Sequence, residues 1–170
     1  MTPHQIELVQ QSFADVKPIA AAAAELFYNR LFTLDPSLRT MFKGDIRQQG
    51  QMLMSMIGAA VNGLTNLDAL VPVVRSLGAR HVNYGVRDAH YPVVGGVLLW
   101  TLEQGLGPKF TPEVREAWAE AYGLLANTMM QGAELDAPRS ASGASPHWGA
   151  NQQPGEAGSA VSGLETGAPV

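Results

Sequence analysis

Hydrophobic residues recur every three or four positions through residues 1–134, the spacing that places them on one face of an α-helix. The first such series is Ile6, Val9, Phe13 and Val16, and similar series follow it along the chain. No stretch alternates apolar and polar residues with a period of two, which is the pattern of a half-buried strand. The pattern therefore predicts an all-α domain without β-strands.

The predicted helix boundaries carry residues that commonly start and end helices. Thr2 is placed to cap the first helix, with a proline at its first position and Gln5 to complete a capping box. Gly85 is placed to end the helix that begins after Asn66. About seven helices of uneven length favour a compact domain with crossed packing over an up-and-down bundle. The other helical elements are expected to begin at Pro18, at Asp35-Pro36, after Lys43-Gly44-Asp45, at Tyr91-Pro92 and at Thr111-Pro112.

The composition changes at residue 135. In residues 135–170, 22 of the 36 residues are Ala, Gly, Ser or Pro, and no helical period of apolar residues continues there. Such a segment buries too little apolar surface to offset the entropy lost on ordering. The sequence therefore predicts a domain of residues 1–134 and a low-complexity, disordered tail of residues 135–170. The alternative is a tail that binds a partner, with His147-Trp148 as its anchor.

Charge and composition exclude several classes of protein. The net charge of −4 and the pI near 5.5 provide no basic surface for nucleic acid. The absence of cysteine excludes disulfides, iron–sulfur clusters and thiolate-bound zinc or haem within this chain. The sequence has neither a signal-peptide pattern nor an apolar run of the roughly 20 residues that span a membrane. We expect a cytoplasmic protein, and the sequence leaves its oligomeric state open.

His81 is the one histidine that lies within a long, mostly apolar helical stretch. Neutral imidazole is the commonest protein ligand for transition metals, so His81 is a candidate metal ligand. Gln49 and Leu53 share a face of a preceding helix that can return opposite His81, and Tyr28 can point into the same space. A slot with histidine on one side and tyrosine and glutamine on the other resembles a haem pocket, because porphyrin supplies four of the iron ligands. The alternative is a core or surface histidine without a ligand. The other histidines lie in terminal segments or before a predicted helix start, where partial exposure is expected: His4, His147 and His90.

Six ordered segments give the sequence a family resemblance. Across residues 3–134 the chain resembles the bacterial single-domain globins that are related to the haem domain of flavohaemoglobins. Any one segment alone is a weak signal, but six in order are specific. The segments are Leu26-Phe27-Tyr28-Asn29-Arg30-Leu31-Phe32, Asn66-Leu67-Asp68-Ala69-Leu70, Leu77-Gly78-Ala79-Arg80-His81, Tyr84-Gly85-Val86, His90-Tyr91-Pro92-Val93-Val94-Gly95 and Ala117-Trp118 through Tyr122-Gly123.

The resemblance implies a globin fold, with helices packed three on three around haem b (iron protoporphyrin IX). His81 would be the proximal iron ligand, and Phe42 would pack on the haem. Tyr28 would be the distal tyrosine, Gln49 the residue at the usual distal position and Leu53 the apolar residue one turn later. Without a ligand role, Tyr28 is a core aromatic and Gln49 faces solvent. Further residues expected to contact the haem are Leu77, Arg80, Tyr84 and Val86, of which Arg80 either pairs with a propionate or is a solvated surface side chain.

The resemblance also bears on the proximal side of the haem. In flavohaemoglobin-type domains the proximal histidine contacts a tyrosine and a glutamate that make it more electron-donating. Tyr91 matches the tyrosine, whereas the glutamate position falls on Ala133, with Glu134 one residue away. One residue rotates a helical side chain by about 100°, so the sequence leaves open whether Glu134 replaces the missing carboxylate.

The implied function is reversible binding of O2 and of other diatomic gases such as NO and CO. Hydrogen bonds from Tyr28 and Gln49 would favour O2, which gains partial negative charge on iron, and would slow its release. Slow release suits O2 or NO handling, or NO detoxification with a separate reductase, in which case Tyr28, Gln49 and Tyr91 are the catalytic candidates. The alternative is an O2 store or a gas sensor without catalytic turnover. A third hypothesis is a haem-free helical interaction module. Whether Gln49 itself coordinates iron is left open.

Overall fold

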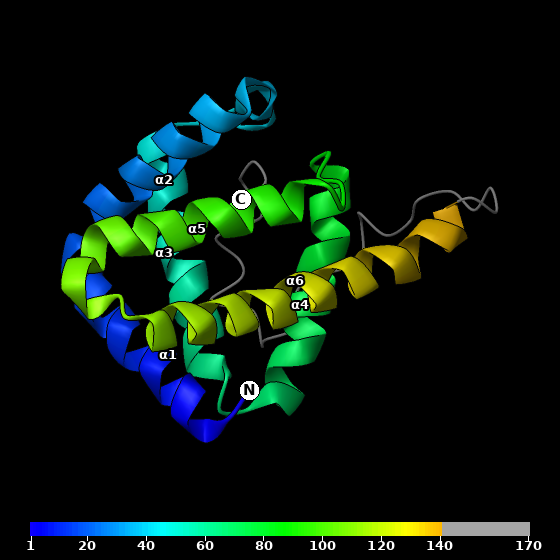
Figure 1. Ribbon diagram of the computed structural model, residues 1–170. Coiled ribbons are helices and arrows are strands. Elements are labelled where there is room, and N and C mark those ends of the chain that lie inside the picture. Colours follow the sequence, from blue (N-terminus) through cyan, green and yellow to red (C-terminus); the bar gives the residue numbers. More distant parts are fainter. Residues whose placement is uncertain (141–170) are drawn as a thin grey trace.

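The protein is built from helices alone over the part that the structure, a computed structural model, describes: the backbone of residues 1–140 and the side chains of residues 1–135. In Figure 1, α5 and α6 run across one side of the molecule, α3 and α4 cross behind them, and α1 and α2 lie toward one end. The α-helices are α1 (Pro3–Val16), α2 (Ala20–Leu34), α3 (Ile46–Gly63), α4 (Leu67–Asn83), α5 (His90–Leu106) and α6 (Pro112–Ser140), and the 3-10 helices are η1 (Lys17–Ile19), η2 (Pro36–Met41) and η3 (Gly107–Lys109).

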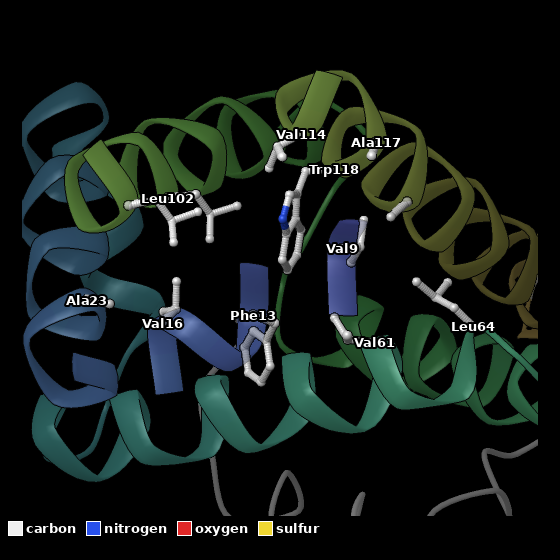
Figure 2. Packing of buried hydrophobic residues seen from close by; sticks show 12 residues of the cluster. Val9, Phe13, Val16, Ala23, Val61, Leu64, Leu102, Val114, Ala117 and Trp118 are labelled. Carbon is white, nitrogen blue, oxygen red and sulfur yellow. The ribbon is translucent and has the colours of Figure 1, made fainter. Parts of the chain in front are cut away.

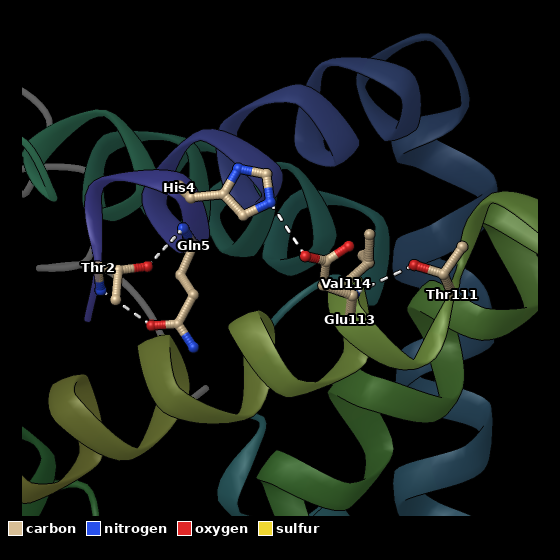
Figure 3. A network of polar contacts seen from close by, with 6 residues as sticks. All are labelled: Thr2, His4, Gln5, Thr111, Glu113 and Val114. Atoms are coloured by element: carbon tan, nitrogen blue, oxygen red, sulfur yellow. Dashed lines mark hydrogen bonds and ion pairs between the residues drawn. The ribbon is translucent and has the colours of Figure 1, made fainter.

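The predicted capping box at the start of α1 is confirmed. Thr2 Oγ1 accepts a hydrogen bond from the Gln5 backbone N–H at 3.1 Å, and Gln5 Oε1 accepts one from the Thr2 N–H at 2.9 Å (Figure 3). The same corner joins the beginning of the chain to α6, where His4 Nε2 lies 3.0 Å from Glu113 Oε1. Both of these side chains are largely exposed, so this pair adds little to stability.

The helix boundaries differ most from the sequence-based expectation at two places. The helix expected at Pro18 starts as the 3-10 turn η1, and α2 begins only at Ala20. At the other end, α6 runs past the predicted domain boundary at residue 134 to Ser140. The predicted tail beyond that residue, with its His147-Trp148 anchor, lies outside the described residues. No helix in residues 1–140 is both long enough and apolar enough to cross a membrane.

The largest hydrophobic cluster lies where α1 packs against α3, α5 and α6. Trp118 on α6 is at its centre and packs against Phe13 on α1, with 6.4 Å between the ring centroids (Figure 2). The indole N–H of Trp118 donates to Ser12 Oγ at 2.8 Å, and that hydroxyl donates to the Leu8 carbonyl at 2.7 Å. The buried polar atoms of this cluster therefore have partners, as a stable core requires.

The close crossing of α4 and α6 depends on two glycines. A Cβ atom added to Gly78 on α4 would overlap the backbone of Met129 on α6, and one added to Gly132 on α6 would overlap the backbone of Arg75 on α4. Backbone atoms cannot rotate away as a flexible side chain can, so both positions require the absence of a side chain. The two glycines set the distance between the helices, and His81 lies one turn beyond Gly78 on α4.

We expect Gly78→Ala to lower the free energy of unfolding by about 3 kcal/mol, because the new methyl group would force α4 away from α6. Gly123→Ala on α6 is the matched control. A Cβ at Gly123 meets no atom within 4 Å, so alanine should raise stability by up to about 1 kcal/mol through its better helix propensity. Urea denaturation followed by circular dichroism measures both changes, and equal midpoints for the two variants would contradict this account.

Candidate functional site

The last turns of α4 present His81 to a cavity of about 100 Å³. The side chain of His81 is 2% exposed. Around it the cavity wall is almost entirely apolar, with Phe27 from α2, Leu53 from α3 and Leu77 from α4 among the lining residues. The polar ring of His81 therefore faces a space in which water has few partners.

The chain turn after α4 brings a second residue back to this cavity. Gly85 has a φ of +90°, a left-handed conformation that favours glycine. The Gly85 N–H donates to the Val82 carbonyl at 3.0 Å, and the Val86 N–H donates to the His81 carbonyl at 3.0 Å. This pair of bonds is the Schellman motif, which ends the helix and folds the following residue back onto it. Val86 consequently lines the same cavity as His81.

The protonation of His81 is determined by its surroundings. Its Nδ1 lies 2.8 Å from the Leu77 carbonyl oxygen. Because a carbonyl can only accept, Nδ1 carries the proton and Nε2 keeps its lone pair. Burial lowers the pKa of His81 to about 4, and the hydrogen bond to Leu77 opposes this with a smaller effect. At neutral pH His81 is therefore a neutral imidazole whose Nε2 is free to bind a metal ion.

A second, smaller cavity of about 20 Å³ lies beside the first. Phe42, which follows η2, lines it together with Met41. Three residues line both cavities and form the wall between them: Val86, His90 and Val94. The two cavities therefore meet at these three residues.

On the side of α2 and α3, Tyr28 and Gln49 lie close together. Tyr28 is 1% exposed, and its hydroxyl donates to the backbone carbonyl of Gln49 across 3.4 Å, a long and therefore weak hydrogen bond. The Tyr28 ring packs edge-on against Phe27 and Phe42, with centroid distances of 5.2 and 5.3 Å. Burial raises the pKa of Tyr28 well above its ordinary value of 10.0, so the hydroxyl stays protonated and remains a donor.

Gln49 is held in place by a close helix crossing. A Cβ added to its neighbour Gly50 would lie 2.8 Å from the Cβ of Ala24 on α2, so α2 and α3 approach closely there. Gln49 is only 4% exposed, and its side-chain Oε1 is buried with no hydrogen-bond partner in the described structure. A buried polar atom without a partner costs stability, which is a common sign of a functional site.

The predicted site residues fall into two groups. His81, Leu53, Leu77, Val86 and Tyr91 line the larger cavity, and Phe42 lines the smaller one. Four others line neither cavity: Tyr28, Gln49, Arg80 and Tyr84. The expectation that Gln49 faces solvent if it has no ligand role is wrong, because its side chain is buried.

Two of the residues outside the cavities nevertheless lie near the turn that carries His81. The Tyr84 ring lies 5.8 Å from the His81 ring, centroid to centroid. Arg80 is half-buried, and its Nη1 atom is buried without a partner in the described structure. An unpaired guanidinium nitrogen attracts an anionic group, since burying it alone is unfavourable.

The proximal side carries a tyrosine pair. Tyr122 on α6 donates its hydroxyl to the Tyr91 backbone carbonyl at 2.7 Å, and the Tyr122 ring fills the space beside Gly95 on α5. Burial, with a smaller contribution from Asp88, raises the pKa of Tyr91 to about 12. Among the described residues no carboxylate hydrogen-bonds His81 or the Tyr91 hydroxyl. Ala133 is half-buried, whereas Glu134 is exposed.

Sequence reasoning missed His90 as a lining residue. The sequence predicted His90 just before a helix that starts at Tyr91-Pro92, whereas α5 begins at His90 itself, and the expected partial exposure of His90 is observed. Nothing local in the sequence shows that the start of α5 borders the cavity of α4. Trp118, Tyr122 and Met129 of α6, none of them expected from the sequence to be site residues, also line the larger cavity.

Comparison with known proteins establishes the family. The globin family profile matches residues 25–129, which include both faces of the cavity. The chain belongs to the globin family. Among solved structures, this globin is similar to a bacterial globin from Campylobacter jejuni, with a TM-score of 0.68, 25% identity, 78% of this chain covered and 96% of that one. The globin fold expected from the sequence is thereby confirmed.

The relatives of this globin include flavohaemoproteins. It is 29% identical over 134 residues to the flavohemoprotein of Bacillus subtilis, and the aligned region covers 77% of this chain and 33% of that protein. It is 34% identical over 120 residues to the flavohemoprotein of Rhodopirellula baltica, and the aligned region covers 66% of this chain and 29% of that protein. The chain thus spans about one third of the length of these relatives, and it is a bacterial-type globin related to their haem domains.

A further solved structure is similar over nearly its whole length. It is an engineered carbene transferase derived from a Rhodothermus marinus protein that is named for nitric oxide dioxygenase activity. The TM-score is 0.72 and the identity 27%, with 82% of this globin and 99% of that chain covered.

The residues around the cavity suit haem. His81 Nε2 is the only uncommitted ring nitrogen on a buried histidine among the described residues, and no group of three or more His, Asp or Glu side chains there can hold a metal ion. A metal bound by His81 therefore needs a cofactor to supply its other ligands, as porphyrin does for iron. The apolar wall suits the porphyrin plate, and Gln49 Oε1 and Arg80 Nη1 have no hydrogen-bond partner within the described part of the chain.

We expect Gln49→Met to raise the free energy of unfolding of the haem-free protein by about 1 kcal/mol. The substitution keeps the volume of the side chain and removes the unpaired buried Oε1 atom. Gln51→Met, an exposed position on the same helix, is the control and should leave stability nearly unchanged. Chemical denaturation of the haem-free variants provides the measurement, and a loss of stability in Gln49→Met would show that the amide has a partner.

Proposed function

We propose that this globin binds haem b through His81 and reversibly binds O2 and other diatomic gases, with NO and CO among them. The observation that carries the proposal is the buried, neutral His81 with a free Nε2 in an apolar cavity. When bound, haem supplies an iron with one open coordination position, at which a gas molecule binds.

The chain's own residues have distinct parts in this proposal. His81 holds the iron, and the Leu77 carbonyl orients the imidazole through the bond to Nδ1. Leu53 and Phe27 exclude water from the cavity. Tyr28 contributes a neutral hydroxyl whose bond to the Gln49 carbonyl is long, so it can turn toward a ligand with partial negative charge. The Gln49 amide would contribute a second polar group there.

We infer a role in O2 or NO handling with slow O2 release. The kinship with flavohaemoproteins and with a protein named for nitric oxide dioxygenase supports oxidation of NO by bound O2, with electrons from a reductase outside this sequence. In that role Tyr28, Gln49 and Tyr91 are the residues that would take part.

A protein that stores O2 or senses gas, without turnover, is the second candidate. It is favoured by the proximal side, where His81 bonds a neutral carbonyl and Glu134 is exposed. A carbonyl polarises imidazole less than a carboxylate does, and a less electron-donating histidine suits reversible binding better than oxidation. Consumption of NO over many turnovers with a supplied reductase distinguishes the two candidates.

The first test concerns the cofactor. We expect His81→Ala to abolish stable haem binding, because Nε2 of His81 is the only proposed protein ligand to the iron. The control is His4→Ala, an exposed histidine at the start of α1 that should keep wild-type binding. Absorption spectra after haem reconstitution provide the measurement: a Soret band in wild type and His4→Ala, and none in His81→Ala. An unchanged band in all three would refute the ligand assignment.

The second test concerns the gas. We expect Tyr28→Phe to release O2 about five- to tenfold faster, since one hydrogen bond to the ligand contributes on the order of 1 kcal/mol or slightly more. Thr101→Val is the control, because it removes a buried hydroxyl that bonds only the carbonyl of Val97 and lines neither cavity. Stopped-flow O2 dissociation from the ferrous protein measures both rates. An unchanged or slower rate in Tyr28→Phe would exclude a hydrogen bond from its hydroxyl.

A further inference from the structure

We propose that His90 binds a propionate carboxylate at the edge of the haem, where the two cavities meet. This inference rests on the proposed function, since it concerns how the same site holds its cofactor. It arises from the position of His90 at the first residue of α5, where it lines both cavities.

His90 differs chemically from everything else around the smaller cavity. The other six lining residues there are Leu31, Leu38, Met41, Phe42, Val86 and Val94, all of them apolar. Among the described residues, His90 therefore provides the only polar side chain that lines the smaller cavity. It is also half-buried, so the junction lies near the protein surface. A ligand with an apolar body and an anionic edge would place that edge at such a position, where water can still reach it.

The hydrogen bonding of His90 leaves one ring atom available as a donor. The Arg87 backbone N–H donates to His90 Nδ1 at 3.0 Å. Because Nδ1 accepts this bond, it carries no proton, and the neutral ring must hold its proton on Nε2. No hydrogen bond to Nε2 occurs within the described part of the chain. His90 is therefore fixed in the tautomer opposite to that of His81, with a donor where His81 has a lone pair.

The two tautomers suit two different tasks. A lone pair on Nε2 binds a metal ion, whereas an N–H on Nε2 binds an anion. The Arg87 N–H thus orients His90 as a donor while the Leu77 carbonyl orients His81 as a ligand. A carboxylate is the expected acceptor, since it accepts strong hydrogen bonds and haem carries two of them.

The test separates the two ring nitrogens of His90. His90→Asn places an amide oxygen near the position of Nδ1, which keeps an acceptor for the Arg87 N–H. The shorter asparagine has no atom at the position of Nε2, so the donor there is lost. His90→Gln places an amide NH2 near the position of Nε2, which keeps the donor and loses the acceptor. Each variant, the wild type and the exposed-site control His4→Asn are loaded with haem or with haem dimethyl ester, whose carboxylates are blocked. The rate of haem transfer to excess apomyoglobin is then measured.

We expect His90→Asn to lose haem about five- to tenfold faster than wild type, and His90→Gln to remain within about twofold. With the dimethyl ester, His90→Asn and wild type should release at the same rate, because the contact is already absent. Equal rates of wild type and His90→Asn with haem would overturn the inference. So would an equal acceleration with haem and with the ester, which would indicate a structural effect only. If the wild type binds no haem at all, the proposed function is wrong as well, and the Soret band reports that separately.

Discussion

The close contact between the backbones of α4 and α6 is the constraint on which the rest of the site depends. Gly78 and Gly132 have no side chains, and the backbones of Met129 and Arg75 occupy the space that a Cβ would take. His81 follows Gly78 by three residues on the same helix, so any increase in the helix separation would move its ring. The position of the ring relative to α3, and with it the width of the cavity, is therefore set by a contact that contains no functional atom.

The site combines an apolar wall with a few polar groups whose partners differ. His81 and His90 each have one ring nitrogen fixed by the backbone, one by a carbonyl and the other by an N–H. These opposite bonds give two identical side chains opposite chemistry. Gln49 has a buried oxygen that no described residue hydrogen-bonds, which is unfavourable for the folded protein without a ligand. Such a group is best explained by a ligand that the folded chain accommodates.

The groups near Tyr28 and the groups near His81 bear differently on the proposed function. On the distal side, Tyr28 has a protonated hydroxyl on a long hydrogen bond and is therefore available to a ligand. On the proximal side, the described residues give His81 only a neutral partner, and Tyr91 offers its carbonyl to Tyr122. In the proposed function, Tyr28 would hydrogen-bond a polarised gas, while His81 would donate little electron density to it. This difference between the two sides would decide between the two proposed roles, storage and oxidation.

The sequence by itself determined the local structure and the metal-binding candidate. Capping at Thr2, the left-handed Gly85 and the three- to four-residue spacing of apolar side chains act within one or two helical turns, so they can be read from neighbouring residues. The apolar surroundings of His81 were predicted in the same way, from the residues next to it in the chain. Only the tertiary structure decided that Gly78 and Gly132 meet other helices, that Tyr28 bonds the carbonyl of Gln49 and that His90 joins two cavities. Those contacts join residues far apart in the chain, and their geometry follows from helix crossings that no local pattern specifies.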